Sequence, residues 1–300
     1  MNGVALIYPC RAPSRDPMVV LKLLGSLRSL EANAVGDSLG RLVVATSEPE
    51  RFRDVLQGDA LVVEVPDLAE ELRRTGVADA NKNWAIMKDA FAGLDAAFPH
   101  SDDGHALLFG DDVLLAHGPY DLRTHPLLHR CGTLTMAQHA ARTDKSSGGA
   151  KWKRSLAATA RLLEGSPGFD GRMYSVHAPV WAGVREARWI REKVMWGASF
   201  HAHPEGYEPW SMFAAAAFAL GTARPVAEFD NRKPATVARL AAGIAESGPG
   251  REFISYDEAA ELPLAALAML PRPSRWERPG AVVGELLACL DRKRNERSMG

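Results

Sequence analysis

The sequence has few cysteines and almost no net charge, and each shortage excludes a class of protein. Its 300 residues include three cysteines, Cys10, Cys131 and Cys289, which are too few and too scattered for a disulfide framework. We therefore expect a reducing compartment, the cytoplasm. Lys and Arg total 36 against 37 for Asp and Glu, so no overall field draws the chain onto nucleic acid or a membrane.

Long hydrophobic runs are missing as well. The apolar run at residues 4–8 is shorter than the core of a signal peptide. The longest apolar stretch, residues 212–220, is far below the roughly 20 residues that a membrane-spanning helix needs. We therefore expect no membrane partner. The content of 46% hydrophobic residues instead predicts a chain that buries one large core or two modest ones.

Short apolar runs alternate with helical periods in the first 115 residues. Buried parallel strands are expected at residues 4–8, 42–46, 61–65 and 106–109. Apolar side chains recur at helical spacing over 19–33 and 81–94, so these segments are expected to be helices that cover the sheet. The alternation predicts right-handed crossovers and a doubly wound, Rossmann-type α/β sheet.

The second half of the chain has a less regular pattern. Residues 144–150 have the small and polar composition of a mobile loop or lid. The pattern then predicts a helix at 152–163, a strand at 173–181 interrupted by Pro179, and helices at 184–196 and 208–220. Beyond residue 225 it is mostly helical. We therefore expect a main domain at 1–230 and a helical C-terminal extension at 231–300 packed on it.

An acidic pair follows the fourth expected strand. Asp111 and Asp112 come soon after the apolar residues 106–109, and open parallel sheets bind ligands at the carboxyl ends of their strands. Two adjacent carboxylates are hard oxygen ligands, which suit Mg²⁺ or Mn²⁺ with substrate phosphates in the remaining coordination positions. A solvated acidic turn is the alternative that the dipeptide alone leaves open.

Several short segments carry a resemblance that runs in order through most of the chain. They are YPCRAPSRDPMVVLKLLGSLRSLEANA, NKNWAIMKDAF, HALLFGDDVLL, FDGRMYSVHAPVW, EFISYDEA and LPRPSRWE. Together they resemble a glycosyltransferase family that is frequent in bacteriophages and has a GT-A fold. The chain is also distantly similar to the Stealth capsular sugar-phosphate transferases, but their Tyr-Thr-Trp-Val-Asp core is absent. This departure favours transfer of a sugar over transfer of a sugar phosphate.

The resemblance implies a GT-A-like, nucleotide-sugar-binding sheet and the activity of a metal-dependent hexosyltransferase. The donor would be UDP-glucose or a similar nucleotide sugar, and Asp111 and Asp112 would hold Mn²⁺ or Mg²⁺ and the diphosphate. We expect the nucleotide-sugar side to be lined by Tyr8, Pro9, Arg11, Asn81, Lys82 and Asn83. The last three begin a helix, and an ordinary helix cap is the alternative role for them.

Catalytic roles are predicted for Asp112, His177 and Glu208. His177, in the His-Ala-Pro block, is expected to bind the metal or to orient the acceptor, with a structural histidine as the alternative. Glu208 is one of three candidate bases, with Asp230 and Asp257, that would deprotonate the acceptor hydroxyl in an inverting reaction. A retaining reaction needs no such base.

A basic segment suggests what the acceptor is. It contains Lys145, Lys151, Trp152, Lys153 and Arg154 without an acid between Lys145 and Arg154, which suits a nucleic-acid backbone. Since the family is concentrated in phages, we favour 5-hydroxymethylcytosine in double-stranded phage DNA as the acceptor, reached by base flipping in the host cytoplasm. A solvated surface, a polysaccharide acceptor and a non-catalytic DNA- or carbohydrate-binding protein remain alternatives.

A zinc site is the weaker metal prediction. The zinc-ligand residue types His125, His129, Cys131, His201 and His203 occur at loose spacing. Closed zinc sites show tighter pairs of ligands.

Overall fold

The computed structural model describes residues 3–14, 16–67, 82–126, 128–141, 147–165, 171–174, 178–193, 209–222, 226–229, 233–256 and 261–298. Its main sheet has five strands in the order β3-β2-β1-β4-β8. They are β1 (Val4–Pro9), β2 (Leu39–Thr46), β3 (Leu61–Glu64), β4 (His105–Leu108) and β8 (Val180–Gly183).

Four of these strands are parallel, as the sequence predicts. Strand β1 pairs with β2 on one side and β4 on the other, so Ile7 lies between Val43 and Leu108. Strand β3 continues the parallel set beyond β2, while β8 adds an antiparallel edge beside β4. The expected α/β fold with a mainly parallel sheet is therefore confirmed.

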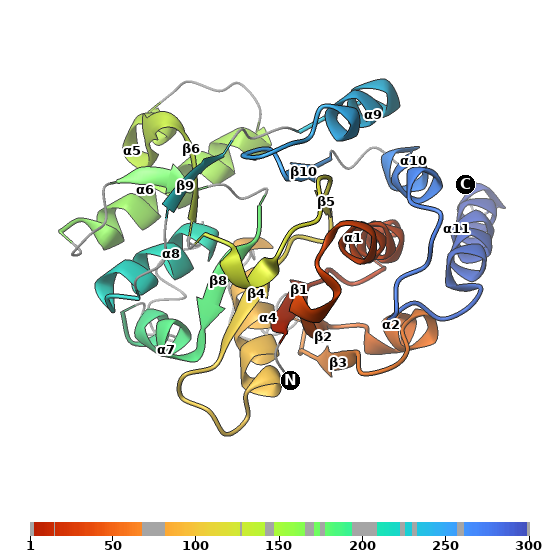
Figure 1. The fold of residues 1–300 in the computed structure, drawn as a ribbon, viewed down its shortest axis with the longest axis horizontal. Helices are drawn as coiled ribbons and strands as arrows, with labels where there is room; N and C mark the ends of the chain where they lie inside the picture. The colour runs from red at the N-terminus through yellow and green to blue at the C-terminus, as the bar shows by residue number, and fades with distance from the viewer. Residues whose placement is uncertain are drawn as a thin grey trace.

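Helices cover both faces of this sheet (Figure 1). Helices α1 (Val19–Asn33) and α2 (Pro49–Val55) connect β1, β2 and β3 in one direction, and α4 (Lys82–Ala97) returns toward β4 in the other. With right-handed crossovers, this reversal puts α4 on the opposite face from α1 and α2. Helix α4 packs closely on β1, because a Cβ at Gly93 would lie 2.6 Å from Ile7 Cγ2.

Polar contacts join α1 to β5 (Val113–Leu115), the strand that follows the acidic pair. The Ser26 hydroxyl donates to the carbonyl oxygen of Val113 at 2.5 Å. One turn later, the Leu115 amide donates to Ser29 Oγ at 2.9 Å, and Asn33 Nδ2 donates to the Leu115 carbonyl at 2.7 Å. These hydrogen bonds, two of them buried and the third partly buried, hold the chain just after Asp112 in a fixed position on α1.

Two smaller sheets complete the β structure. Strand β10 (Phe253–Ser255) pairs antiparallel with β5, and β6 (Leu128–Thr135) lies between β7 (Arg172–Tyr174) and β9 (Val226–Phe229). The prediction of a helical pattern after residue 225 is therefore wrong at β9 and β10, which are too short to show a strand period. The predicted strand at 173–181 is divided between β7 and β8, which belong to different sheets.

The remaining helices lie mostly in the second half of the chain. They are α5 (Met136–Ala141), α6 (Ser147–Leu163), α7 (Val184–Lys193), α8 (Pro209–Ala219), α9 (Val237–Ala245), α10 (Glu261–Met269) and α11 (Ala281–Ser298). The loop predicted at 144–150 is wrong from residue 147 onward, because α6 already begins at Ser147. Gly148 and Gly149 fall in its first turn, where amide groups lack intrahelical partners and glycine is tolerated better than in the interior.

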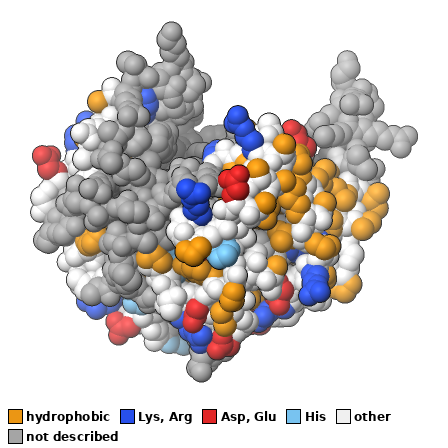
Figure 2. Space-filling view, turned by 45° about the horizontal axis from the view of Figure 1, so that its top comes forward, with side chains coloured by type: hydrophobic (Ala, Val, Ile, Leu, Met, Phe, Trp, Pro, Cys, Tyr) orange, Lys and Arg blue, Asp and Glu red, His pale blue; other side chains and the backbone are white. Residues whose placement is uncertain are grey.

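The C-terminal part packs on α1 and α2 through a strap that we define as residues 270–280. Its Glu277 accepts two hydrogen bonds from Arg28 of α1, and its Trp276 donates from Nε1 to Asp59 at 2.9 Å. Exposed apolar side chains of this part are Val237, Leu264, Met269, Val283 and Leu287, and Figure 2 shows a broad apolar area on one side of the molecule. The domain boundary at residue 230 stays a prediction.

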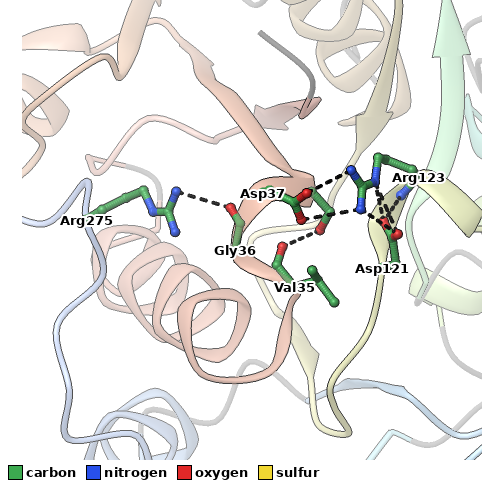
Figure 3. A network of polar contacts seen from close by, with 7 residues as sticks. Val35, Gly36, Asp37, Asp121, Arg123 and Arg275 are labelled. Atoms are coloured by element: carbon green, nitrogen blue, oxygen red, sulfur yellow. Dashed lines mark hydrogen bonds and ion pairs between the residues drawn. The ribbon is translucent and has the colours of Figure 1, made fainter.

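An exposed ionic network ties the loop after β5 to the turn after α1 (Figure 3). Arg123 forms ion pairs with Asp37 at 3.1 Å and Asp121 at 2.8 Å, and Arg275 donates to the Gly36 carbonyl at 3.5 Å. The hydrogen bond from Arg123 lowers the pKa of Asp121.

Within the part of the chain that the structure describes, no helix combines the length and apolar content needed to cross a bilayer.

Candidate functional site

The direction of the chain connections changes between β1 and β4. From β1 the chain moves through α1 to β2 and then β3, and it returns through α4 to β4 on the other side of β1. In open α/β sheets, ligands bind in the crevice outside the carboxyl ends of the strands at this kind of switch point. Residues 10–14 and 16 follow β1 and residues 109–112 follow β4, and the charges of Arg11 and Asp16 act on Asp111 at this edge.

Asp111 lies half-buried at this edge without a hydrogen-bond partner in the described part of the chain. Burial raises its pKa to about 7, and the neighbouring charge of Asp112 acts in the same direction. The charges of Lys22 and Arg11 oppose this shift only partly. Asp111 is therefore a carboxylate that is partly withdrawn from water and whose oxygens no described residue satisfies, which is the environment of a ligand-binding group.

Among the described residues, Asp112 is held on one side. Ser255 in β10 donates a hydrogen bond to Asp112 Oδ2 at 3.1 Å, and the Tyr256 amide donates to the main-chain oxygen of Asp112 at 3.2 Å. On the other side, a Cβ at Gly110 would lie 2.8 Å from Asp112 Oδ1. Glycine at position 110 therefore leaves the second carboxylate oxygen the space that a larger residue would take.

The sequence analysis missed an ion pair beside these aspartates. Asp16 Oδ2 lies 2.6 Å from Lys22 Nζ, and the Lys22 side chain is only 3% exposed. Asp16 Oδ1 also accepts from the Met18 amide at 3.0 Å, just before α1 begins. Lys22 interrupts the apolar stripe of α1, and this misplaced charge is the signal that could have revealed it.

Asp89 on α4 is a second residue that the sequence analysis missed. Burial raises its pKa to about 8, and its charge reaches Cys10 at the end of β1. Burial also raises the pKa of the Cys10 thiol, and the charges of Asp111 and Asp89 raise it further. Cys10 is therefore a protonated, buried thiol and no reactive thiolate.

Of the residues expected on the nucleotide side, the side chain of Tyr8 belongs to the core. It is 0% exposed, its hydroxyl shares a 2.8 Å hydrogen bond with Ser26, and its ring stacks on Phe109. This side chain therefore packs between the sheet and α1, and a role of Tyr8 on the nucleotide side stays a prediction. Pro9 is buried at the end of β1, and Arg11 is half-buried and close enough to lower the pKa of Asp111.

Many of the other predicted residues lie outside the described part of the chain. They are Asn81, Lys145, His177, Glu208, Asp230 and Asp257. Helix α4 begins at Lys82 followed by Asn83, and α6 contains Lys151 and Trp152, but the description does not extend to these four side chains. Also in α6, Lys153 is half-buried and Arg154 is exposed. The catalytic and acceptor assignments of these residues stay predictions.

The residues that could hold a metal are the two aspartates. His125 is buried, with Nε2 bonded to the Pro179 carbonyl at 3.0 Å and Nδ1 bonded to the Tyr120 hydroxyl at 2.9 Å, so neither ring nitrogen is open to zinc. Among the described residues, no group of three or more His, Cys, Asp or Glu side chains could hold an ion. Two carboxylates suit Mg²⁺ or Mn²⁺, which takes its other ligands from phosphate and water.

Comparison with known proteins finds likeness in structure but not in sequence. No protein-family profile matches the chain, and no curated protein matches it. Mouse xyloside xylosyltransferase 1 in its apo form is 10% identical, with coverage of 85% of this chain and 97% of that chain and a TM-score of 0.41.

Two structures of LgtC are also similar to this chain. An active-site mutant is 14% identical, covers 90% of this chain and 98% of its own, and has a TM-score of 0.44. The galactosyltransferase LgtC in complex with donor and acceptor sugar analogues is 14% identical, with coverage of 94% and 99% and a TM-score of 0.40.

Proposed function

We propose that the protein is a metal-dependent glycosyltransferase with a GT-A-like fold, which moves a hexose from UDP-glucose or a similar nucleotide sugar to an acceptor hydroxyl. The observation that carries the proposal is Asp111. Its half-buried carboxylate has no hydrogen bond in the described part of the chain, and it lies at the switch point beside Asp112, whose Oδ1 has no hydrogen-bond partner among the described residues. The motifs that resemble phage glycosyltransferases include this same pair.

The donor set of the two aspartates fits a divalent cation that binds together with a diphosphate. When bound, Mn²⁺ or Mg²⁺ would stabilise the negative charge that develops on the leaving nucleoside diphosphate. Two cationic side chains of the chain itself would also act on the diphosphate of the donor. Arg11 lies near the pair, and Lys22 balances part of its charge while held by Asp16. Helix α4 begins at Lys82 and Asn83, and the free amide groups of a helix start would favour an anionic or hydroxyl-rich ligand there.

The acceptor side is proposed to involve His177 and Glu208, the first to orient the acceptor and the second to remove its proton. For the acceptor itself we favour 5-hydroxymethylcytosine in DNA. Support comes from the basic residues Lys145, Lys151, Lys153 and Arg154 with Trp152, most of which belong to one helix, α6. A basic helix with an aromatic residue can follow a phosphate backbone and stack on a base that has left the duplex.

The first test is nucleotide release in the presence of Mn²⁺. Purified protein is given UDP-glucose and other nucleotide sugars, with and without DNA that contains 5-hydroxymethylcytosine. We expect DNA to stimulate UDP release and the modified base to gain the mass of a hexose. Asp111→Asn and Asp112→Asn should each lower the rate by about 100-fold or more, because charge stabilisation at the leaving group is lost. The exposed Asp54→Asn is the matched control and should leave the rate unchanged.

Each other outcome has a definite meaning. UDP release at a rate that DNA does not change indicates that the acceptor is a glycan or a small molecule. Release of UMP indicates transfer of a sugar phosphate. Release from no donor, with ligand binding intact in both asparagine variants, contradicts the proposal and favours a binding protein. DNA affinity that survives the combined Lys151→Ala, Lys153→Ala and Arg154→Ala changes removes the support for a DNA acceptor.

A further inference from the structure

Ser255 is the described residue that contacts the carboxylate of Asp112. It ends β10, 143 residues after Asp112 in the sequence, and its side chain is completely buried. Register pairs Ser255 with Val113, so its hydroxyl lies next to the end of the acidic pair. The hydrogen bond to Asp112 Oδ2, at 3.1 Å, is the side-chain contact through which the C-terminal part reaches the candidate site.

The two oxygens of Asp112 therefore have different surroundings. Oδ2 accepts from Ser255, while Oδ1 faces the space left by Gly110 and has no hydrogen-bond partner among the described residues. The main chain of Asp112 is fixed as well, because its carbonyl accepts from the Tyr256 amide. A carboxylate held at one oxygen and along its backbone can turn only a little, so the open oxygen keeps one direction.

We propose that Ser255 is a positioning residue, which holds Asp112 so that Oδ1 is presented to the divalent cation. The inference rests on the proposed role of Asp112 as a metal ligand. Groups that hydrogen-bond a ligating side chain orient it before the metal arrives, and removal of such a group typically weakens metal affinity by about 10- to 100-fold. The inference also makes the C-terminal part a contributor to the site, beyond a layer packed on the main domain.

The test measures Mn²⁺ binding to the full-length protein by electron paramagnetic resonance, without donor or acceptor. Ser255→Ala should raise the dissociation constant by about 10-fold or more, and Ser255→Thr, which keeps the hydroxyl, should restore it. Gly110→Ala should also weaken binding, since its methyl group would crowd Oδ1. Ser247→Ala is the matched control, because Ser247 donates to the Ala116 carbonyl in the same part of the chain and should not affect the metal.

The outcomes separate this inference from the proposed function. If wild type binds Mn²⁺ and Asp112→Asn abolishes binding, yet Ser255→Ala binds as tightly as wild type, the positioning role is overturned and the metal site stands. Equal losses in Ser255→Ala and Ser255→Thr, with native melting curves, also overturn it. If wild type binds no Mn²⁺ at all, the proposed function fails together with the inference. In kinetics, the positioning role predicts a higher Mn²⁺ requirement for Ser255→Ala with little change in kcat at saturating metal.

Discussion

Glu277 in the strap and Asp111 at the edge of the main sheet are both carboxylates withdrawn from water, but they are treated in opposite ways. Both oxygens of Glu277 accept from Arg28, at 2.6 Å and 2.8 Å, in a bidentate pair. Asp111 accepts nothing from the described residues, and its nearest counter-charges, Lys22 and Arg11, only reduce the rise in its pKa. The carboxylate of Glu277 stabilises the contact between the strap and α1, whereas the carboxylate of Asp111 is left for a ligand to bind.

Removal of Glu277 should have the largest effect on stability. Glu277→Ala leaves the guanidinium of Arg28, only 11% exposed, without its partner, and should lower the free energy of unfolding by about 2–4 kcal/mol. Urea denaturation measures the loss, and Mn²⁺ affinity should stay as in wild type. If Glu277→Ala instead lost much Mn²⁺ affinity and little stability, Glu277 would contribute to ligand binding, and the contrast between Glu277 and Asp111 would be wrong.

The pH dependence of stability should distinguish Asp111 from the paired carboxylates. In the folded protein its pKa is raised to about 7, whereas an unfolded Asp titrates near 4. The stability that this group contributes is therefore fully present below about pH 4 and is lost as the pH rises through about 7.

Asp111→Asn does not titrate, so without metal its stability relative to wild type should be about 2–3 kcal/mol higher at pH 8 than at pH 5. Urea denaturation of both proteins at the two pH values measures this difference, in which the titration of all other groups cancels. A constant difference would show that Asp111 is charged at both pH values. Mn²⁺ at pH 8 should stabilise wild type and leave Asp111→Asn almost unchanged.

A smaller effect is expected at Tyr256, which tests how much a buried polar group without a hydrogen bond lowers the free energy of unfolding. Its hydroxyl is buried with no hydrogen-bond partner among the residues that the structure describes, and it lies 3.6 Å from where a Cβ of Gly25 would be. Tyr256→Phe should raise the free energy of unfolding by about 0.5–1 kcal/mol in urea denaturation. The control Tyr120→Phe removes a hydroxyl bonded to His125 and should instead lower stability by about 1 kcal/mol. Loss of stability in Tyr256→Phe would mean that the hydroxyl holds a bound group.

The smallest effect is expected at the exposed network of Arg123. Solvent and salt screen its pairs with Asp37 and Asp121, although the geometry in Figure 3 is good. Arg123→Ala should change the melting temperature by no more than about 1 °C, and high salt should remove even that difference. A loss as large as that of Glu277→Ala would show that pairing geometry matters more than burial.

The part of the fold that the sequence predicts is the part whose signal is local. Helix α1 has the predicted bounds, since about four turns of apolar spacing cannot be mistaken for a strand. The four parallel strands are continuous apolar runs. Helix α2 was not predicted, because its seven residues bury only Pro49, Phe52 and Val55. Strand β10 has three residues, and its strand state depends on pairing with β5.

In the candidate site as well, only the residues with a local sequence signal could be predicted. Asp111 and Asp112 could be placed from the sequence, because they end an apolar strand and strand ends meet at one edge of a parallel sheet. The partners that define their environment could not be placed. Lys22 reaches the site because α1 packs against this edge of the sheet, and Ser255 comes from a strand nearly half the chain length away. Such contacts have no signal in a local pattern of residues.

The pairing of β5 with β10 has a consequence for the synthesis of the protein. The 143 residues between Asp112 and Ser255 take roughly 7–30 s to translate, so the growing chain presents the acidic pair long before its partner strand exists. During that time the edge of β5 is open to other strands, and long-range closure of this kind is slow in folding. The site is therefore completed late in synthesis, when β10 pairs with β5. Chaperones that shield open strand edges should raise the yield of active protein more than they raise the yield of a correctly formed parallel sheet.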